Sequence, residues 1–319
     1  MKTWLIVSAL TIMCWQKAGA QAIDNLQAYK YINDDRYIRL NYENDFFTAT
    51  DEYYTQGINL EVVSPAMHRN PLTHVLPVPK HWQTQYGFDI QHNGYTPTNT
   101  DNNDIRYGDR PFAGTLMLNT FGLSTDTVNR QRLSSSISTG VIGPLAGAGQ
   151  MQRSIHKWLG NYTPHGWDNQ VANDVILNYE VAYEKQLLSY SRYASLTASA
   201  LGHAGTLTDK LGLGTTLMLG YFKDPFNNTQ ARHFTIYAYD HPKVELIGYD
   251  ATLQGGVFNK ESPYTIASYD ISRITFQNRW GVVVQYRRIY LEYFQSYLTK
   301  EFAGEHDHRW GGIQIAFGF

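Results

Sequence analysis

Hydrophobic and polar residues alternate along much of this chain, most clearly at its end. In residues 311–319 four large apolar side chains alternate with small or polar ones; the apolar set is Ile313, Ile315, Phe317 and Phe319. Successive side chains of a strand point to opposite faces. An apolar outer face and a polar inner face suit a strand of a transmembrane β-barrel, although an edge strand of a soluble β-sandwich could carry the same pattern.

The same period of two predicts about a dozen strands. They lie near residues 38–43, 58–62, 85–91, 112–124, 130–142, 175–184, 192–203, 211–221, 244–256, 270–279, 282–297 and 309–319. Twelve is an even number, as single-chain bacterial barrels require. We therefore predict an all-β fold, a 12-stranded antiparallel transmembrane β-barrel that forms one domain over residues 21–319.

The connections should alternate between long outer loops and short inner turns. With the N-terminus in the periplasm, the outer connections are 46–53, 93–111, 143–173, 204–210, 257–269 and 298–308. Short inner turns are expected at Ser191 and at Arg279-Trp280-Gly281. The inner connection 64–82 fits least well, because it is long and holds four prolines.

Residues 1–20 have the pattern of a secretory signal peptide. Lys2 precedes an apolar run from Trp4 to Trp15, and Ala18-Gly19-Ala20 supplies a small-residue cleavage site. The only cysteine, Cys14, lies in this segment, so the mature protein should have neither a disulfide nor a thiolate metal ligand. The terminal Phe319 resembles the assembly signal of outer-membrane barrels, which makes the barrel assembly machinery an expected partner during biogenesis.

Composition agrees with a barrel in the outer membrane. The 24 tyrosines and 7 tryptophans could form the two aromatic girdles of a barrel, although ordinary core aromatics would also account for them. No stretch after the signal peptide approaches eighteen apolar residues, which excludes a membrane-spanning helix. The net charge of -2 argues against nucleic acid as a partner, because no basic stripe exists to neutralise phosphates.

One outer connection should contain a short helix. From Leu145 to Leu159 the apolar period becomes helical, with one stripe formed by Met151, Ile155, Trp158 and Leu159. Gln152 and His156 lie beside that stripe at positions i and i+4, so they should point the same way. Spacing alone favours a surface helix with His156 in solvent.

Polar residues of three segments should meet at the outer rim. Asn44 and Asp45 follow the first strand, Thr55 opens the second, and His156 lies in the third outer connection. The alternation places Asp45 and Thr55 on the lumen side and Asn44 on the other, unless a bulge turns it. Oxygen ligands from Asn and Asp suit Ca²⁺, and a nearby histidine could act as general base toward water. A plain turn is the alternative, since Asn and Asp are common turn residues.

Five sequence blocks in a fixed order resemble the lipid A 3'-O-deacylase (LpxR-type) family of outer-membrane β-barrel enzymes. The blocks are YENDFF at 42–47, TDEYYTQG at 50–57, GDRPFAG at 108–114, GVIGP at 140–144 with Gln152 and His156 after it, and GWDNQ at 166–170. They span roughly residues 36 to 185. The later strands match more weakly but end correctly at Phe319.

The resemblance implies a carboxylic ester hydrolase of the bacterial outer membrane with its active site on the extracellular side. Its substrate would be lipid A of lipopolysaccharide, from which it would remove the 3'-linked acyloxyacyl group with Ca²⁺ as cofactor. Carried onto this chain, the resemblance makes His156 the general base, with Thr55 and Gln152 as further catalytic-site residues. It makes Asn44 and Asp45 the residues that organise the Ca²⁺ site, with the cation stabilising the oxyanion.

Two departures from the family pattern affect the substrate contacts. The loop 98–104 holds no lysine where the best-known relatives carry a functional one, so Arg106 or Arg110 would have to replace it. Gly160-Asn161 stands where an acidic residue is expected a turn beyond the histidine. Arg110 also has a structural interpretation, a salt bridge that fixes the start of the fourth strand. The cluster 306–308, with two histidines, could bind a metal, but solvated side chains are the commoner outcome for such a loop.

Two other classes of function remain open from the sequence. An outer-membrane phospholipase with a serine nucleophile would need a serine beside His156, and Ser154 should face elsewhere on the helix. A passive porin or structural barrel would need no cation, no water-activating histidine at the rim, and a lumen open to solutes.

Overall fold

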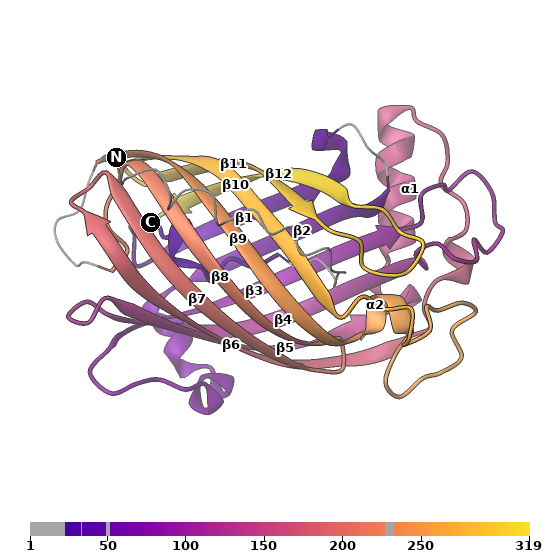
Figure 1. The fold of residues 1–319 in the computed structure, drawn as a ribbon, viewed down its shortest axis with the longest axis horizontal. Coiled ribbons are helices and arrows are strands. Elements are labelled where there is room, and N and C mark those ends of the chain that lie inside the picture. The colour runs from indigo at the N-terminus through magenta and orange to yellow at the C-terminus, as the bar shows by residue number, and fades with distance from the viewer. Residues whose placement is uncertain (1–22, 33, 49–51, 227–232) are drawn as a thin grey trace, which may run out of the picture.

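The computed structural model describes residues 23–32, 34–48, 52–226 and 233–319. Within them, antiparallel strands form a closed barrel in which each strand pairs with its sequence neighbours and the first pairs with the last (Figure 1). The strands are β1 (Tyr37–Asn44), β2 (Tyr53–Val63), β3 (Gln83–Thr96), β4 (Ala113–Asp126), β5 (Gln131–Ile142), β6 (Asp174–Tyr190), β7 (Ala194–Gly205), β8 (Thr208–Tyr221), β9 (Phe234–Asp250), β10 (Ile274–Tyr286), β11 (Ile289–Leu298) and β12 (His308–Gly318). The predicted 12-stranded barrel is confirmed.

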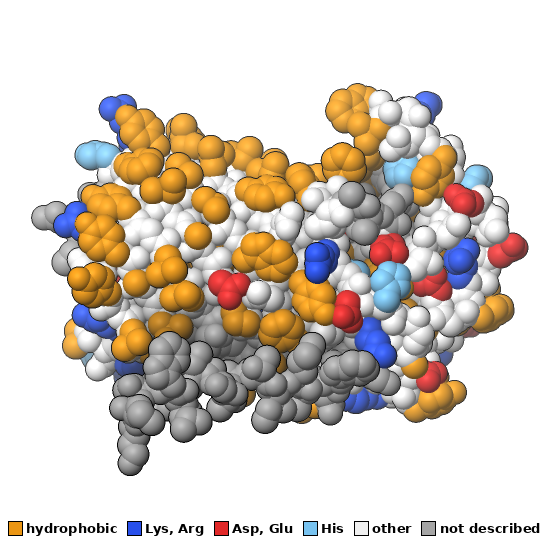
Figure 2. Space-filling model, turned by 45° about the horizontal axis from the view of Figure 1, so that its top comes forward, with side chains coloured by type: hydrophobic (Ala, Val, Ile, Leu, Met, Phe, Trp, Pro, Cys, Tyr) orange, Lys and Arg blue, Asp and Glu red, His pale blue; other side chains and the backbone are white. Residues whose placement is uncertain are grey.

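The alternation in the sequence places apolar side chains outside and polar ones inside. On β12, Ile315 is 51% exposed whereas its neighbour Gln314 is 0% exposed. Figure 2 shows hydrophobic side chains spread over the barrel wall, with Asp and Glu mostly toward the end that carries the long loops and Lys and Arg at both ends. Closure leaves no open strand edge, so the wall can pair its backbone groups within lipid.

The boundaries of the ninth to eleventh strands correct the prediction. β9 begins at Phe234, ten residues before the predicted 244, and it is followed by the short helix α2 (Ala251–Gln254). The turn predicted at 279–281 is wrong, because β10 runs through it and Gly281 pairs with Tyr239. A Cβ at Gly281 would lie 2.8 Å from the Tyr239 hydroxyl, so this glycine permits close packing rather than a turn. The actual turn follows at Arg287, whose φ is 51°.

The two ends of the barrel differ as predicted. At the end called here the long-loop rim, the connections after β1, β3, β5, β9 and β11 contain most of the irregular chain (Figure 1). At the other end Ser191 lies in a tight turn with φ of 53°. The long connection 64–82 at that end contains the 3-10 helices η3 (Pro65–Arg69) and η4 (Pro71–Val75), each with proline in its first turn and a side-chain cap.

The segment 23–32, which includes η1 (Ala28–Lys30), lies inside the barrel. The Ala28 N–H donates to the carboxylate of Glu184 on β6 at 3.0 Å, and the Tyr237 hydroxyl of β9 donates to the Tyr29 carbonyl at 2.6 Å. The Arg39 guanidinium of β1 donates to the Lys30 carbonyl at 3.1 Å. Contacts to strands on several sides of the wall show that this segment fills the lumen, which the sequence did not predict.

Two ion pairs join buried charged side chains around that segment. Arg39 bonds Glu61 at 2.6 Å, and Lys210 bonds Glu245 at 3.1 Å. Isolated charges would be costly at such burial, so these pairs let polar groups fill the barrel interior.

Among the described helices none is long and apolar enough to cross a membrane. The predicted signal peptide, residues 1–20, lies outside the described residues.

Candidate active site at the long-loop rim

The helix α1 (Ala148–Leu159) lies at the long-loop rim, just after the 3-10 turn η5 (Pro144–Ala146). The helix confirms the prediction over 145–159, and its burial differs from the one that spacing alone favours. Its buried residues are Ala148, Gly149, Gln152 and His156, whereas Trp158 of the apolar stripe is 84% exposed. His156 is therefore buried rather than solvated, because the helix presents its small and polar face to the polar rim of the barrel.

Close backbone contact holds α1 against the rim. A Cβ at Gly149 would lie 2.7 Å from the Trp167 ring, and one at Gly114 of β4 would lie 2.6 Å from the Ala148 Cβ. The Trp167 ring packs on Phe112 with centroids 5.1 Å apart. Only glycine allows the helix to approach this closely. Trp167 belongs to the short 3-10 helix η6 (Trp167–Asn169) and is 1% exposed.

Gln152 connects α1 to both neighbouring elements. Its Nε2 donates to Oγ1 of Thr55 at 3.0 Å, and its Oε1 accepts from the Trp167 indole N–H at 2.7 Å. An indole N–H can only donate, so it fixes which end of the Gln152 amide faces Thr55. The predicted meeting of Gln152 with the β2 rim is confirmed.

Thr55 and Asn44 meet at a bulge in β2. The pairing of β2 with β3 shifts register between Tyr54 and Gln56, which leaves Thr55 unpaired in the ladder and 4% exposed. Asn44 Nδ2 donates to the Thr55 carbonyl, and Asn44 Oδ1 accepts from the Phe46 N–H at 2.6 Å. Asn44 is half-buried on the same side of β1 as Tyr42, as the alternation predicts.

Asp45 begins the 3-10 helix η2 (Asp45–Thr48) and is 2% exposed. Its Oδ2 accepts from the Glu52 N–H at 2.6 Å, which ties the two ends of the β1–β2 connection together. The donor atoms offered by Asn44 and Asp45 are oxygens, the ligand type that Ca²⁺ takes. The described residues fit a hard cation in chemistry, with the buried Asp45 carboxylate as the charged ligand.

The His156 ring is oriented by the chain that follows α1. His156 Nδ1 lies 2.9 Å from the Tyr162 carbonyl oxygen, and the Tyr162 ring stands edge-on to the imidazole with centroids 5.2 Å apart. Gly160 ends the helix with φ of 72°, and the Asn161 N–H then bonds the His156 carbonyl at 2.9 Å. This left-handed turn brings Tyr162 back to the histidine, at the place where the family pattern expected an acidic residue.

The geometry fixes the tautomer of neutral His156. A backbone carbonyl can only accept, so Nδ1 must carry the proton in the bond to Tyr162. The lone pair of the neutral ring then lies on Nε2, which makes Nε2 the basic atom.

The two arginines of the β3–β4 loop differ in exposure. The Arg110 guanidinium is 0% exposed, bonds Glu301, and lies over the Tyr95 ring at 4.6 Å. The buried ion pair with Glu301 agrees with the structural interpretation of Arg110, whereas its contact with substrate stays a prediction. The Arg106 side chain is 39% exposed and lies 3.5 Å from Asp109. Arg106 stays available to a ligand at the rim.

The serine expected to face away from His156 does so. Ser154 is exposed, and its hydroxyl donates to the Gln150 carbonyl at 2.8 Å.

The expectation of solvated histidines in the last loop is only partly right. His306 is exposed beside Glu52, whereas His308 is buried beside Glu305.

Sequence reasoning assigned no role to Trp167 or Tyr162. Trp167 lies in the GWDNQ block, and a buried aromatic N–H in a polar loop is a signal of a hydrogen-bond partner. Tyr162 acts through its backbone, which no residue type reveals.

Together the barrel, its polar filled interior and the helix held over one side of the rim define an outer-membrane β-barrel with a candidate hydrolytic site. The model of the family described as outer membrane protein LpxR matches residues 5–319, and the chain belongs to that family. The resemblance stated from the sequence blocks is thereby confirmed.

One of two similar solved structures, the first named here, supports the fold. LpxR from Salmonella typhimurium aligns with a TM-score of 0.73 and 19% identity, covering 89% of this chain and 100% of that chain. The β domain of the Bordetella autotransporter BrkA aligns with a TM-score of 0.46 and 8% identity, covering 90% of this chain and 100% of its own. No curated protein sequence matches this chain.

Proposed function

We propose that this protein is a calcium-dependent lipid A 3'-O-deacylase, which hydrolyses the 3'-linked acyloxyacyl ester in the outer leaflet of the outer membrane. Membership of the LpxR family supports the substrate class. The observation that carries the chemistry is the 2.9 Å contact between His156 Nδ1 and the Tyr162 carbonyl. A histidine held in one tautomer at a loop rim is suited to proton transfer.

His156 Nε2 is the proposed general base. In ester hydrolysis the oxygen of a water adds to the carbonyl carbon while the base takes a proton from that water. The same proton then passes to the departing sugar oxygen as the ester C–O bond breaks, which releases the fatty acid and restores neutral His156. The Tyr162 carbonyl stabilises the intermediate imidazolium, because its acceptor faces the Nδ1 proton.

Asn44 and Asp45 are the residues proposed to hold Ca²⁺. Their oxygens fit such an ion, and the Asp45 carboxylate is buried at the mouth of the β1–β2 connection. When bound, Ca²⁺ would polarise the ester carbonyl and stabilise the developing oxyanion. Asn44 also donates a hydrogen bond to the Thr55 carbonyl, and Gln152 donates one to the Thr55 hydroxyl. Both residues therefore fix the position of Thr55 at the rim.

Exposed apolar side chains at the rim support a lipid substrate. Phe46, next to Asp45, is 78% exposed, and Trp158 and Leu159 at the end of α1 are 84% and 57% exposed. Side chains of this kind suit contact with acyl chains. The proposed active site faces the extracellular side, where lipid A resides.

The alternatives receive less support. A passive pore needs an open lumen, whereas residues 23–32 cross this one and bond its wall. A serine nucleophile beside His156 is disfavoured, because the Ser154 hydroxyl is turned to the Gln150 carbonyl.

Mass spectrometry of lipid A tests the proposal. Cells that express the protein should yield lipid A lacking the mass of the 3' acyloxyacyl group, and cells that express His156→Ala should yield intact lipid A. Intact lipid A from cells with folded, surface-inserted parental protein would reject the deacylase.

A further inference from the structure

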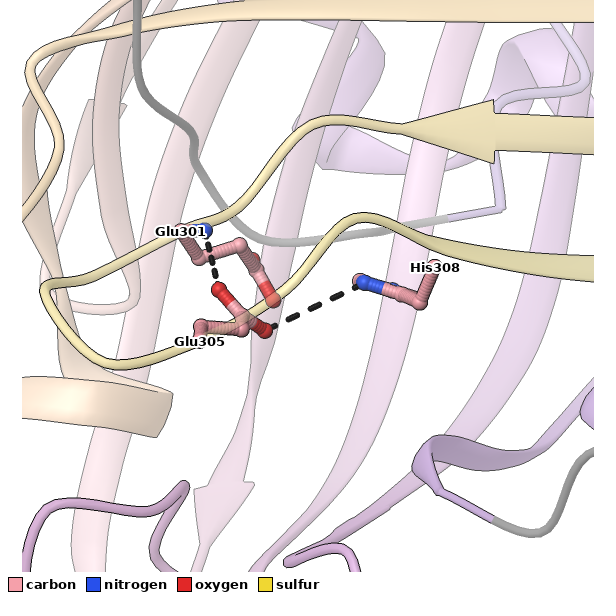
Figure 3. Close-up of side chains that lie close together, drawn as sticks. All are labelled: Glu301, Glu305 and His308. Atoms are coloured by element: carbon pink, nitrogen blue, oxygen red, sulfur yellow. Dashed lines mark hydrogen bonds and ion pairs between the residues drawn. The ribbon is translucent and has the colours of Figure 1, made fainter.

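A second cluster of ligand-type side chains lies in the last loop of the long-loop rim, between β11 and β12. Glu301, Glu305 and His308 are all buried, and one ligand atom from each lies within 4.8 Å of the others. Figure 3 shows the Glu305 carboxylate between Glu301 and the His308 ring. None of these residues belongs to the site proposed above.

The Glu305 carboxylate has a bound end and an unsatisfied end. Its Oε2 accepts from the backbone N–H groups of Glu301 and Phe302. Its Oε1 is buried and has no hydrogen-bond partner among the described residues, and His308 Nδ1 lies 3.9 Å from it. The side chain is 6% exposed. This carboxylate oxygen faces the imidazole nitrogen beyond hydrogen-bond distance, at a separation that a shared ligand would span.

Negative charge exceeds positive charge around this cluster. Glu301 bonds the Arg110 guanidinium, and that guanidinium also bonds Thr252 at 2.8 Å. Thr252 in turn donates to Asp250, which is 0% exposed. One arginine thus faces three carboxylates, those of Asp250, Glu301 and Glu305. Either a proton or a cation must offset the remaining charge.

We propose that Glu301, Glu305 and His308 bind a divalent cation, which fixes the β11–β12 loop to the rim. Two carboxylate oxygens and one imidazole nitrogen are a ligand set for Zn²⁺ or Mn²⁺ rather than for Ca²⁺, which takes oxygen ligands. The cation would bridge Glu305 Oε1 and His308 Nδ1 and leave Oε2 in its backbone bonds.

The position of the cluster gives the cation a structural role. His308 packs against Tyr53 at the start of β2 with ring centroids 5.2 Å apart, and Tyr53 also contacts His306. Arg110 bonds Glu301 from the opposite loop, between β3 and β4. Binding would therefore join the loops after β3 and β11 and the start of β2 around one ion.

Calorimetry of the full-length protein in detergent tests this proposal. Protein freed of metal with chelator should bind one equivalent of Zn²⁺ with a dissociation constant in the micromolar range or tighter, and Ca²⁺ at tenfold excess should not displace it. Glu305→Gln keeps the side-chain size and should weaken Zn²⁺ binding at least tenfold. His306→Ala, an exposed neighbour, should bind as the parent does.

A second readout separates the cation from a shared proton. Co²⁺ in place of Zn²⁺ should give a visible absorption spectrum that His308→Asn abolishes while the barrel keeps its heat-dependent mobility shift. Absence of Zn²⁺ binding to the folded parent, or binding that Glu305→Gln and His308→Asn leave unchanged, would overturn the proposal. If Glu305→Gln fails to fold, His308→Asn alone decides the test. Loss of deacylase activity is not a readout here, so failure of one proposal leaves the other standing.

Discussion

Gln152 on α1 donates a 3.0 Å hydrogen bond to the hydroxyl of Thr55 on β2, a residue 97 positions earlier in the chain. The same amide accepts from Trp167, so three separate segments meet in one buried side chain. This contact fixes the helix that carries His156 to the strand that follows Asp45.

Gln152→Ala should lower deacylation strongly while the barrel still folds. The substitution leaves the Thr55 hydroxyl and the Trp167 N–H without their partner, at a cost of about 1–3 kcal/mol for each buried group. The helix should then detach from the rim more often, which protease cleavage near residues 148–159 would report. Ser154→Ala on the exposed face of the same helix is the control and should behave as the parent. Equal protease resistance of Gln152→Ala and the parent would contradict the role of this contact.

His156→Ala should lower the deacylation rate by about a hundredfold or more, the size expected for a lost general base. His156→Asn should do the same, since an amide keeps the hydrogen bond to Tyr162 but offers no basic nitrogen. Rates are measured on purified lipid A in detergent. His165→Ala is the matched control, because His165 is exposed and should be silent. A parental rate in either His156 variant would remove this residue from the mechanism.

Chelation should abolish deacylation, and added Ca²⁺ should restore it. Asp45→Asn removes the buried charge with little change of size and should lower the rate by about 10²–10³, as the loss of an oxyanion-stabilising group does. Asp104→Asn, in an exposed part of the β3–β4 loop, should keep full activity. Activity that persists in excess chelator would argue against the cation, whatever the effect of Asp45→Asn.

Removal of residues 23–32 should convert the closed barrel into a conducting one. The segment occupies the lumen through bonds to Glu184, Arg39 and Tyr237, so its loss leaves a polar interior that water can enter. Single-channel recordings in planar bilayers should show negligible conductance for the parent and steady conductance for the deletion. If the deletion fails to fold, Tyr237→Phe combined with Gln285→Ala removes two anchors and should give intermittent openings. Steady conductance of the parent would contradict a filled lumen.

Gly149→Val should lower stability and activity together. The added side chain would overlap the Trp167 ring, since a Cβ already lies at 2.7 Å, and overpacking of this kind costs about 1–3 kcal/mol. Tryptophan fluorescence should report the displaced Trp167. Gly202→Ala is the control, because its Cβ would meet only Leu211 at an ordinary 3.7 Å. An unchanged spectrum and rate in Gly149→Val would show that α1 is held in another way.

Sequence determined the barrel. The outer face of each strand contacts lipid and the inner face contacts polar groups, so apolar and polar residues must alternate. Gln314, which faces inward, and Ile315, which faces outward, are an example. The hydrophobic pattern also predicted the number of strands and the helix at 145–159. Local pattern failed at Gly281, where a glycine that signals a turn instead makes room for Tyr239 in the middle of β10.

Contacts between distant segments were decided only by the tertiary structure. The helical period of α1 could not say which face turns inward, because burial of Gln152 and His156 depends on partners in β2, η6 and the chain after Gly160. The segment 23–32 carries no strand pattern, and only the surrounding wall shows that it fills the lumen. His308 likewise becomes a candidate ligand because the folded loop places its ring 3.9 Å from the Glu305 carboxylate. A side chain's chemistry is set by its own atoms, but its burial and partners are set by chain segments that meet only after the barrel closes.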